Sequence, residues 1–200
     1  MTADPFFDEF RRLRPDVPVV LLPADAARAG DADVPPVGAD AAAERAAAAR
    51  EEALAVLEEL WPVVGDGRPV PGEVRHSWDG EGPGRVRARV RARSGPEASH
   101  ADVVASGPDD AAGAVARVAV RLQARGWEVA TRPVGGSGTR LTGVRGGEGR
   151  PATVEVVGWG PAQPWDVTVA SAPVEVGAAV TALRRTSVVL GWGARPGDPR

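Results

Sequence analysis

The chain has 200 residues, with 27 acidic and 24 basic side chains and a net charge of −3. Because it contains neither cysteine nor lysine, disulfides, thiol nucleophiles, cysteine-ligated zinc and reactions that need a lysine amine are all excluded. A chain of this length is expected to form one domain with a substantial core, and it has room for an appended arm.

The charge is distributed unevenly along the chain. Residues 1–60 carry 13 acidic residues and 6 arginines, a net charge of −7, whereas residues 61–200 carry 14 acidic residues and 18 arginines, a net charge of +4. We therefore expect an acidic arm and a mildly basic body. The sequence has no signal-peptide pattern and no apolar run of membrane-spanning length, so we expect a cytoplasmic protein that does not bind membranes.

Residues 1–40 are expected to form the N-terminal arm. Near its start, a short helix carries four apolar residues: Phe6, Phe7, Phe10 and Leu13. An apolar strand follows over residues 17–22, and a linker rich in Ala, Asp and Pro extends to residue 40. The sequence leaves three interpretations of this segment open: the helix packs on its own domain, it docks into the groove of a partner protein, or the segment is disordered.

A single α+β domain is expected over residues 41–190, followed by a frayed tail over residues 191–200. It begins with a long alanine-rich helix over residues 41–61, which Pro62 is expected to end. The apolar stripe of this helix becomes clear only in its second half, at Leu54, Leu57 and Leu60. We therefore expect the first half to lie at the surface and the second half to pack.

The clearest strand pattern is RVRARVRAR over residues 85–93, which forms a hairpin with residues 73–78. Its valines and alanines are expected to face the core, and its arginines to face away from it. The outward set is Arg85, Arg87, Arg89, Arg91 and Arg93. Pairing Trp78 with Val86 places Arg75 opposite Arg89, two like charges whose repulsion an anion, salt or water would relieve.

Residues 109–144 form the most regular unit of the chain. Apolar residues at Val115, Val118 and Leu122 predict a helix, which Gly126 is placed to close in the left-handed conformation. Two strands around a glycine-rich turn are expected to follow, up to residue 144.

Further strands are expected over residues 153–157, 166–170 and 187–190, with a short helix over residues 177–185. The predicted fold class is α+β, with an antiparallel sheet of about six or seven strands and two main helices on one face. Each half of the domain has a helix followed by a hairpin, so a duplicated α-β-β unit is also considered. This element order is similar to that of small partner-binding domains, including secretion-chaperone-like and immunity-like modules.

The arginine strand is the most distinctive candidate site, and three interpretations of it remain open. In the first, the strand is a solvated sheet face in a chain whose only basic residue besides histidine is arginine. In the second, it binds an acidic protein or the acidic arm of the chain itself. In the third, it binds nucleic acid or anionic lipid. The net negative charge and the lack of Tyr or Phe near the strand count against nucleic acid.

The remaining candidates are aromatic and histidine residues. Trp159 and Trp165 flank a Pro-rich loop, where they either form an exposed aromatic clamp or cover an end of the sheet. His76 is expected on the core face as a hydrogen-bonded structural residue, and with His100 it shows no metal-ligand spacing. We find no motif for a nucleophile, a metal or a cofactor, so none of the three is expected.

These observations favour a non-catalytic cytoplasmic module that binds a protein partner or a second copy of itself, as an adaptor, chaperone-like or immunity-like protein. The candidate partner-binding residues are Phe6, Phe7, Phe10, Leu13, Trp159 and Trp165. An anion or nucleic-acid binder that uses the arginine strand is the first alternative, and an enzyme of unrecognised type is the second.

Overall fold

The computed structural model describes residues 12, 36–94, 111–135, 138–146, 152–158 and 164–195. The chain divides into two compact units, Met1–Asp33 and Val34–Arg200. Of the first unit only Arg12 is described, and it is helical. The predictions for the strand over residues 17–22 and for five candidate residues lie outside the described residues: Phe6, Phe7, Phe10, Leu13 and Trp159.

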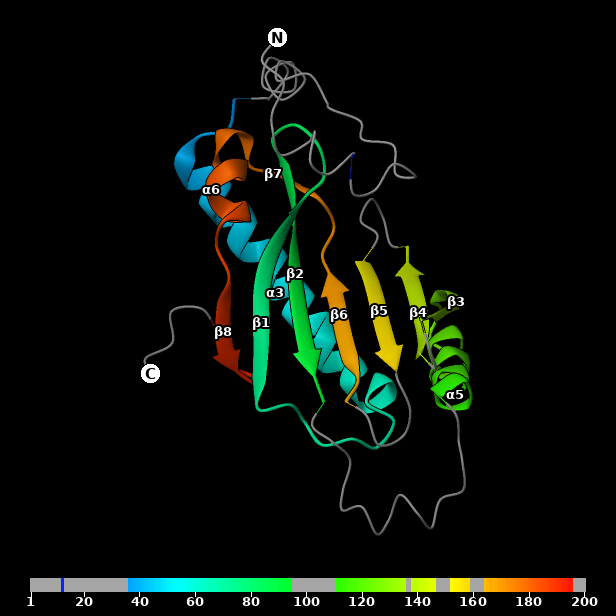
Figure 1. Ribbon diagram of the computed structural model, residues 1–200. Coiled ribbons are helices and arrows are strands. Elements are labelled where there is room, and N and C mark those ends of the chain that lie inside the picture. Colours follow the sequence, from blue (N-terminus) through cyan, green and yellow to red (C-terminus); the bar gives the residue numbers. More distant parts are fainter. Residues whose placement is uncertain are drawn as a thin grey trace. The chain divides into compact units, whose positions relative to one another are not determined.

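The second unit is an α+β domain built on one curled antiparallel sheet (Figure 1). The strands are β1 (Glu73–Gly80), β2 (Arg85–Arg93), β3 (Glu128–Val134), β4 (Gly138–Arg145), β5 (Ala152–Gly158), β6 (Asp166–Ala170), β7 (Val174–Glu175) and β8 (Val188–Gly191). Their order in the sheet is β3-β4-β5-β6-β2-β1-β8, and β7 pairs with the start of β2. The structure confirms the predicted fold class.

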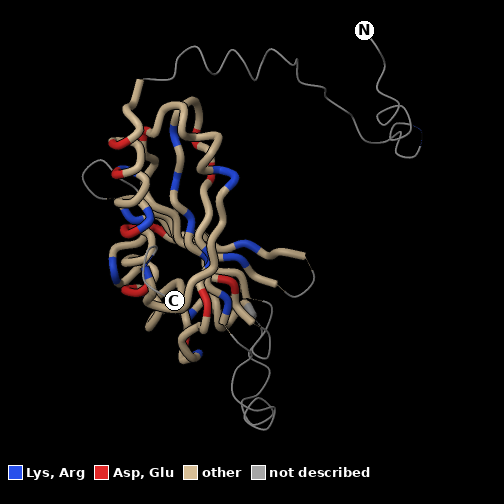
Figure 2. Tube along the Cα trace, turned by 90° about the vertical axis from the view of Figure 1, so that its left-hand side faces the viewer, with Lys and Arg blue, Asp and Glu red and all other residues tan. Residues whose placement is uncertain are grey.

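The helices pack on one face of this sheet, which we call the inner face. They are α3 (Ala39–Val64), α5 (Ala111–Gln123), the 3-10 turn η1 (Gly177–Ala179) and α6 (Val180–Arg184). Helix α3 lies against β2 and β6, and α5 lies against β3, β4 and β5 (Figures 1 and 2). The opposite, outer face carries no helix in the described part of the chain. None of the described helices is both long enough and apolar enough to cross a membrane.

Helix α3 differs from the prediction at both ends. Pro62 lies inside the helix, which continues to Val64. A proline this close to the end removes one backbone hydrogen bond, and the burial of Val63 and Val64 against the core offsets that loss. The first half also packs, since Ala42, Ala46 and the alanines that follow at helical spacing are buried. Small side chains let the helix lie close to its neighbours, so an alanine stripe acts as a core face.

The β1–β2 hairpin keeps the predicted faces, but its register differs from the prediction by two residues. Trp78 lies opposite Ala88, and Arg75 lies opposite Arg91 and not Arg89. Strand β1 continues to Gly80, and the tight turn that follows uses positive φ angles at Gly82 and Gly84. A shift of two residues leaves every side chain on the same face, so the apolar pattern alone does not distinguish the two registers.

The unit around α5 agrees with the prediction. Val115, Val118 and Leu122 are fully buried, and Gly126 has a φ of +80° at the end of the helix. The helix-and-hairpin order occurs twice, as α3-β1-β2 and as α5-β3-β4. The two hairpins occupy different places, because β2 pairs with β6 inside the sheet whereas β3 forms an edge.

Residues 192–195, which follow β8, pack against α3, whereas the sequence predicts a frayed tail from residue 191. Trp192 packs edge-on against Trp61 of α3, with ring centroids 5.3 Å apart. Arg195 forms ion pairs with Glu51 at 2.8 Å and Glu58 at 3.0 Å. These contacts hold the end of β8 against the helix on the inner face. Residues 196–200 lie outside the described residues.

Candidate functional site

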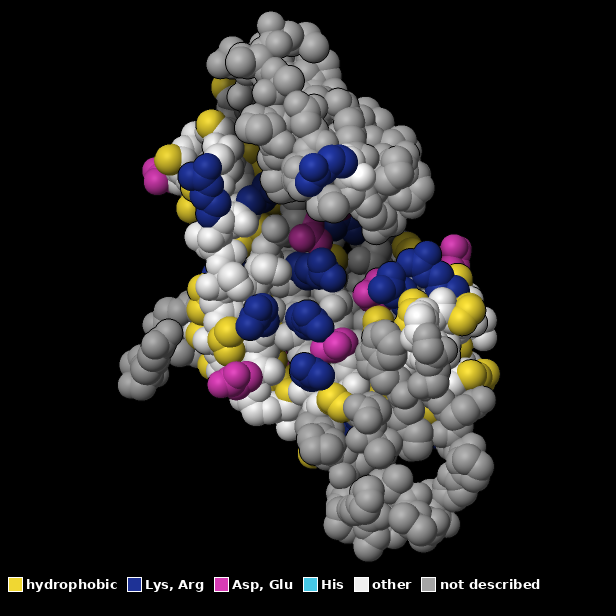
Figure 3. All heavy atoms as spheres, viewed as in Figure 1, with side chains coloured by type: hydrophobic (Ala, Val, Ile, Leu, Met, Phe, Trp, Pro, Cys, Tyr) yellow, Lys and Arg dark blue, Asp and Glu magenta, His cyan; other side chains and the backbone are white. Residues whose placement is uncertain are grey.

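Apolar and basic residues of β2 lie on opposite faces of the sheet, as the alternation predicts. Val86, Ala88, Val90 and Ala92 are at most 1% exposed. The arginines at the alternate positions all lie on the outer face and are exposed or half-buried. We call this row, Arg85, Arg87, Arg89, Arg91 and Arg93, the arginine ridge. Figure 3 shows basic side chains gathered in the middle of the outer face, with acidic side chains between them.

Three arginines of the ridge have carboxylate partners within the same domain. Arg87 pairs with Glu81 at 2.8 Å, and Arg89 pairs with Asp79 at 3.3 Å, both across the β1–β2 turn. Arg91 pairs with Asp166 at the start of β6, at 3.0 Å. The ridge is therefore not a continuous track of free positive charge, and its middle is largely neutralised.

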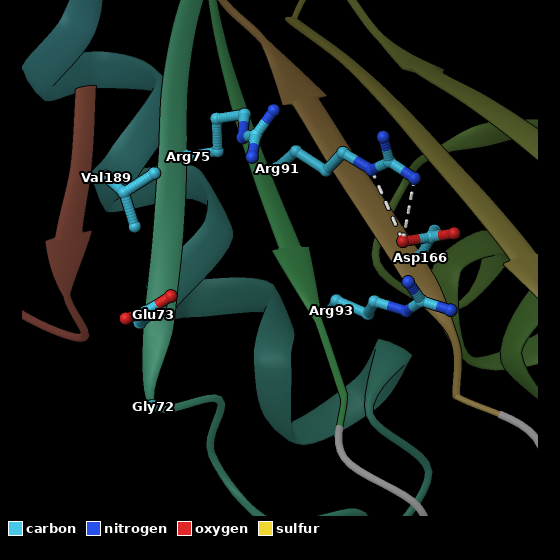
Figure 4. Close-up of a pocket in the computed structure, with 7 residues that line it drawn as sticks. All are labelled: Gly72, Glu73, Arg75, Arg91, Arg93, Asp166 and Val189. Carbon is cyan, nitrogen blue, oxygen red and sulfur yellow. Dashed lines mark hydrogen bonds and ion pairs between the residues drawn. The ribbon is translucent and has the colours of Figure 1, made fainter. Parts of the chain in front are cut away.

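The C-terminal end of the ridge opens into a hollow with a volume of about 510 Å³. We call it the arginine hollow, and seven residues line it (Figure 4): Gly72, Glu73, Arg75, Arg91, Arg93, Asp166 and Val189. Its side chains come from β1, β2, β6 and β8, the four strands of this part of the outer face. Three arginines and two carboxylates leave one net positive charge.

Two arginines of the hollow have no ion-pair partner in the part of the chain that the structure describes. Asp166 lies directly opposite Arg93 on β6, but its carboxylate forms its ion pair with Arg91, and Figure 4 shows Glu73 pointing away from Arg93. Arg75 lies directly opposite Arg91 on the neighbouring strand. Like charges facing each other across a strand pair repel, and the Arg91 guanidinium pairs with Asp166 on the far side of β2. Arg75 and Arg93 are thus available to a carboxylate or phosphate.

Arg85 lies apart from the hollow, at the other end of β2. It lines a second depression of about 420 Å³, between the N-terminal half of α3 and β7, together with Arg45 and Glu175. Arg45 approaches Glu175 to 4.0 Å and donates a hydrogen bond to its carbonyl oxygen at 3.2 Å. This depression therefore already contains a balancing carboxylate.

His76 is buried on the inner face, as predicted, with an exposed fraction of 2%. Both of its ring nitrogens lack a hydrogen-bond partner among the described residues, which differs from the hydrogen-bonded histidine that the sequence suggests. Burial, and then the positive charges of Arg50 and Arg195, lower the pKa of His76 from its usual 6.5 to about 4. The imidazole is therefore neutral near pH 7.

Trp165 is fully buried, and the guanidinium of Arg68 stacks over its ring at 4.0 Å from the centroid. It covers the end of the sheet where β2 meets β6, so it is not part of an exposed clamp. Its backbone N–H donates to the Ser94 hydroxyl at 2.7 Å, and its carbonyl accepts from the Ser94 N–H at 2.9 Å. Ser94 thus extends the β2–β6 pairing by one residue.

Comparison with known proteins adds no assignment, since no protein-family model, curated protein or solved structure matches the chain. Among the residues that the structure describes, no group of three or more His, Asp or Glu residues is placed to hold a metal ion. The arginine hollow is consequently the strongest candidate site on geometric grounds.

Of the residues that line the hollow, the sequence predicts Arg91 and Arg93 as candidate anion-binding residues and Arg75 as an outward arginine facing a like charge, but it does not indicate that the others join them. The alternation on β1 indicates that Arg75 faces outward, but the predicted register pairs it with Arg89, two residues from its actual partner Arg91. Asp166 is 75 residues from Arg91 along the chain, and only the pairing of β2 with β6 brings the two together. Val189 joins the site because β8 pairs with β1, which no local pattern indicates.

Proposed function

We propose that this chain is a non-catalytic protein-binding module that holds an acidic segment of a partner protein on the outer face of its sheet. The observation that carries this proposal is the pair Arg75 and Arg93, which line one open hollow without a carboxylate partner in the described part of the chain. Guanidinium groups donate paired hydrogen bonds to carboxylates, and such charge-assisted bonds are stronger than neutral ones.

The form of the site supports a carboxylate-bearing polypeptide as the ligand. The hollow is a shallow part of an open sheet face, and it has only one net positive charge. An extended peptide places alternate side chains about 7 Å apart on one side, which suits arginines that are themselves separated along strands. Val189, at the edge of the hollow, adds an apolar contact that a peptide side chain can use.

An anion or nucleic-acid binder is the second candidate, and the length of the arginine ridge favours it. Five arginines on one strand resemble a row of phosphate contacts. However, Arg87, Arg89 and Arg91 already pair with carboxylates of the same domain. A nucleic acid would have to displace these partners or accept their negative charge nearby, so we rank this function below peptide binding.

The proposal is tested by titrating the full chain with a fluorescein-labelled peptide rich in glutamate and serine. The double variant Arg75→Gln with Arg93→Gln is expected to weaken binding by about tenfold or more, since each charged hydrogen bond contributes about 1.5–3 kcal/mol. Arg89→Gln is the control for each of the two single substitutions, because it removes one positive charge from the same face, where Asp79 already neutralises it. It is expected to change the affinity by less than about twofold.

A DNA oligonucleotide of the same net charge separates the two candidate functions. Stronger binding of the oligonucleotide than of the peptide, with equal losses in all the arginine variants, would favour the nucleic-acid function. Absence of peptide binding at low salt, where electrostatic attraction is strongest, would exclude the proposed function.

A further inference from the structure

The two edges of the sheet are protected very differently. Edge strand β3 contains Glu128, Arg132 and Pro133, and its neighbour β4 covers only its other side. Charged residues and prolines are the usual means by which proteins prevent an exposed edge from pairing with another chain. Edge strand β8 consists of Val188, Val189, Leu190 and Gly191, and so has neither. In the described part of the chain, only β1 pairs with it.

The hydrogen-bond pattern shows which backbone groups of β8 point outward. The N–H of Trp192 donates to the carbonyl of Gly72 at 3.3 Å, and these two residues continue the β1–β8 register. In an antiparallel pair, hydrogen-bonded and non-hydrogen-bonded positions alternate. Leu190 and Val188 are therefore bonded to β1, whereas the N–H and C=O groups of Val189 point away from it.

The hydrogen bonds of β2 lead to the same assignment of inward and outward backbone groups in β8. In β2, the N–H of Ser94 and the N–H and carbonyl of Ala88 bond toward the β6 side. The even-numbered residues of β2 thus pair with β6 and the odd-numbered residues pair with β1. Arg75, opposite Arg91, directs its backbone groups toward β2, and this leaves Val189 without a backbone bond to β1.

The side chains beside this edge indicate which kind of partner it accepts. Val189 is 41% exposed on the outer face and lines the arginine hollow, and its opposite residue on β1 is Arg75. A strand added to β8 would lie about 10 Å from β1, two strand spacings away. The side chain of Arg75 has no ion pair or hydrogen bond in the described part of the chain, so its guanidinium is free to turn toward a carboxylate there.

We propose that β8 is a strand-addition site, where an extended acidic segment of a partner protein pairs its backbone with Val189 and presents a carboxylate to Arg75. This inference rests on the proposed function and specifies how the partner is held. The backbone bonds supply affinity, and alternate side chains supply selectivity, as in other cases of strand addition. A second copy of the chain fits less well, because edge-to-edge pairing through β8 would bring a second unpaired Arg75 to the same place.

The test uses the full chain and a short fluorescein-labelled peptide of alternating valine and glutamate. Val189→Pro removes the outward N–H without removing a bond to β1, and prolines are tolerated at such edge positions. It is expected to weaken binding by about tenfold or more. Val189→Thr keeps the N–H and the branched shape, and it is expected to stay within about twofold of the wild-type affinity.

A second measurement does not depend on any variant folding correctly. Hydrogen exchange of the wild-type chain should show that the amides of Val189 and Gly191 become protected when the peptide is added. A peptide with alternate backbone nitrogens methylated has the same side chains and charge but fewer donors, and it should bind more weakly than the unmodified peptide by about tenfold.

The outcomes separate this inference from the proposed function. If Arg75→Gln weakens binding while Val189→Pro, backbone methylation and hydrogen exchange show no effect, the acidic ligand lies on the face and strand addition is wrong. If the wild-type chain binds no acidic peptide, both proposals fail. If sedimentation shows a dimer of the chain alone that Val189→Pro converts to a monomer, the occupant is a second copy and the acidic-partner inference is overturned.

Discussion

Strand β2 has an inner face of four apolar residues and an outer face of five arginines. On the inner face, valine and alanine side chains are almost completely removed from water. On the outer face every residue is an arginine, and the ion pairs that these arginines form are partly exposed. Burial of apolar area contributes about 25 cal/mol per Å², whereas an exposed ion pair contributes only about 0–1 kcal/mol.

This difference separates stability from binding within a single strand. The inner face is expected to tolerate little change, because each side chain there touches α3 or the neighbouring core. The outer face can change with little effect on folding, so selection for a ligand can act on it independently. The following predictions test that separation, beginning with the largest effect.

The largest effect is expected in the core between α3 and the inner face of the sheet, from Leu57→Ala. Leu57 is fully buried in α3 where the helix packs on the sheet. The substitution is expected to lower the free energy of unfolding by about 2–5 kcal/mol, because it removes buried area and leaves a cavity. Urea unfolding followed by circular dichroism measures this loss. Glu44→Ala, on the exposed side of the same helix, should change stability by less than about 0.5 kcal/mol.

The pH dependence of stability tests the burial of His76. Because its folded pKa, about 4, is lower than its usual 6.5, the unfolded chain takes up a proton first as the pH falls. Stability contributed by the neutral imidazole is therefore complete above pH 6.5 and is lost between 6.5 and about 4, by roughly 3 kcal/mol in total.

His76→Leu should remove this part of the pH dependence. Its free energy of unfolding, measured in urea at several pH values, is expected to fall less steeply than that of the wild type over the same interval. Equal slopes in the two proteins would mean that His76 is hydrated in the folded state, and the inner face would then be less dry beside β8 than the structure indicates.

The smallest effects on stability are expected on the outer face, where substitutions of Arg89 and Arg75 should change the free energy of unfolding in different directions. Arg89→Gln breaks an exposed pair with Asp79 and should lower stability by at most about 0.5 kcal/mol. Arg75→Gln removes a charge that faces Arg91, so stability should stay the same or rise by a few tenths of a kcal/mol, roughly, while acidic-peptide binding weakens. Thermal unfolding of both variants at low salt measures the difference. A loss above about 1 kcal/mol for Arg75→Gln would show that this arginine has a structural partner.

The alternation of β2, the periodicity of α5 and the glycine at its end were readable from the sequence. Each depends on residues within a few positions of one another: a period of two places Val90 and Arg91 on opposite faces whichever strand is next to them. In the same way, Val115, Val118 and Leu122 lie on one side of any helix that contains them, and Gly126 adopts a positive φ at little steric cost.

The candidate site itself was decided by tertiary structure. The apolar pattern permits two registers of the β1–β2 hairpin with the same faces, and the turn at Gly82 and Gly84 selects the one that sets Arg75 opposite Arg91. The pairing of β2 with β6 sets Asp166 opposite Arg93, where its carboxylate forms an ion pair with the diagonal neighbour Arg91. Neither Arg93 nor Arg75 has an ion pair in the described part of the chain.

The sequence by itself thus determined which residues face the core and which face water, because that depends on local backbone geometry. The three-dimensional arrangement decided which arginines are neutralised, and it made β8 an edge with Val189 facing outward. Both depend on strand pairings between residues far apart in the chain, whose energies are shared among many contacts and leave no local signal.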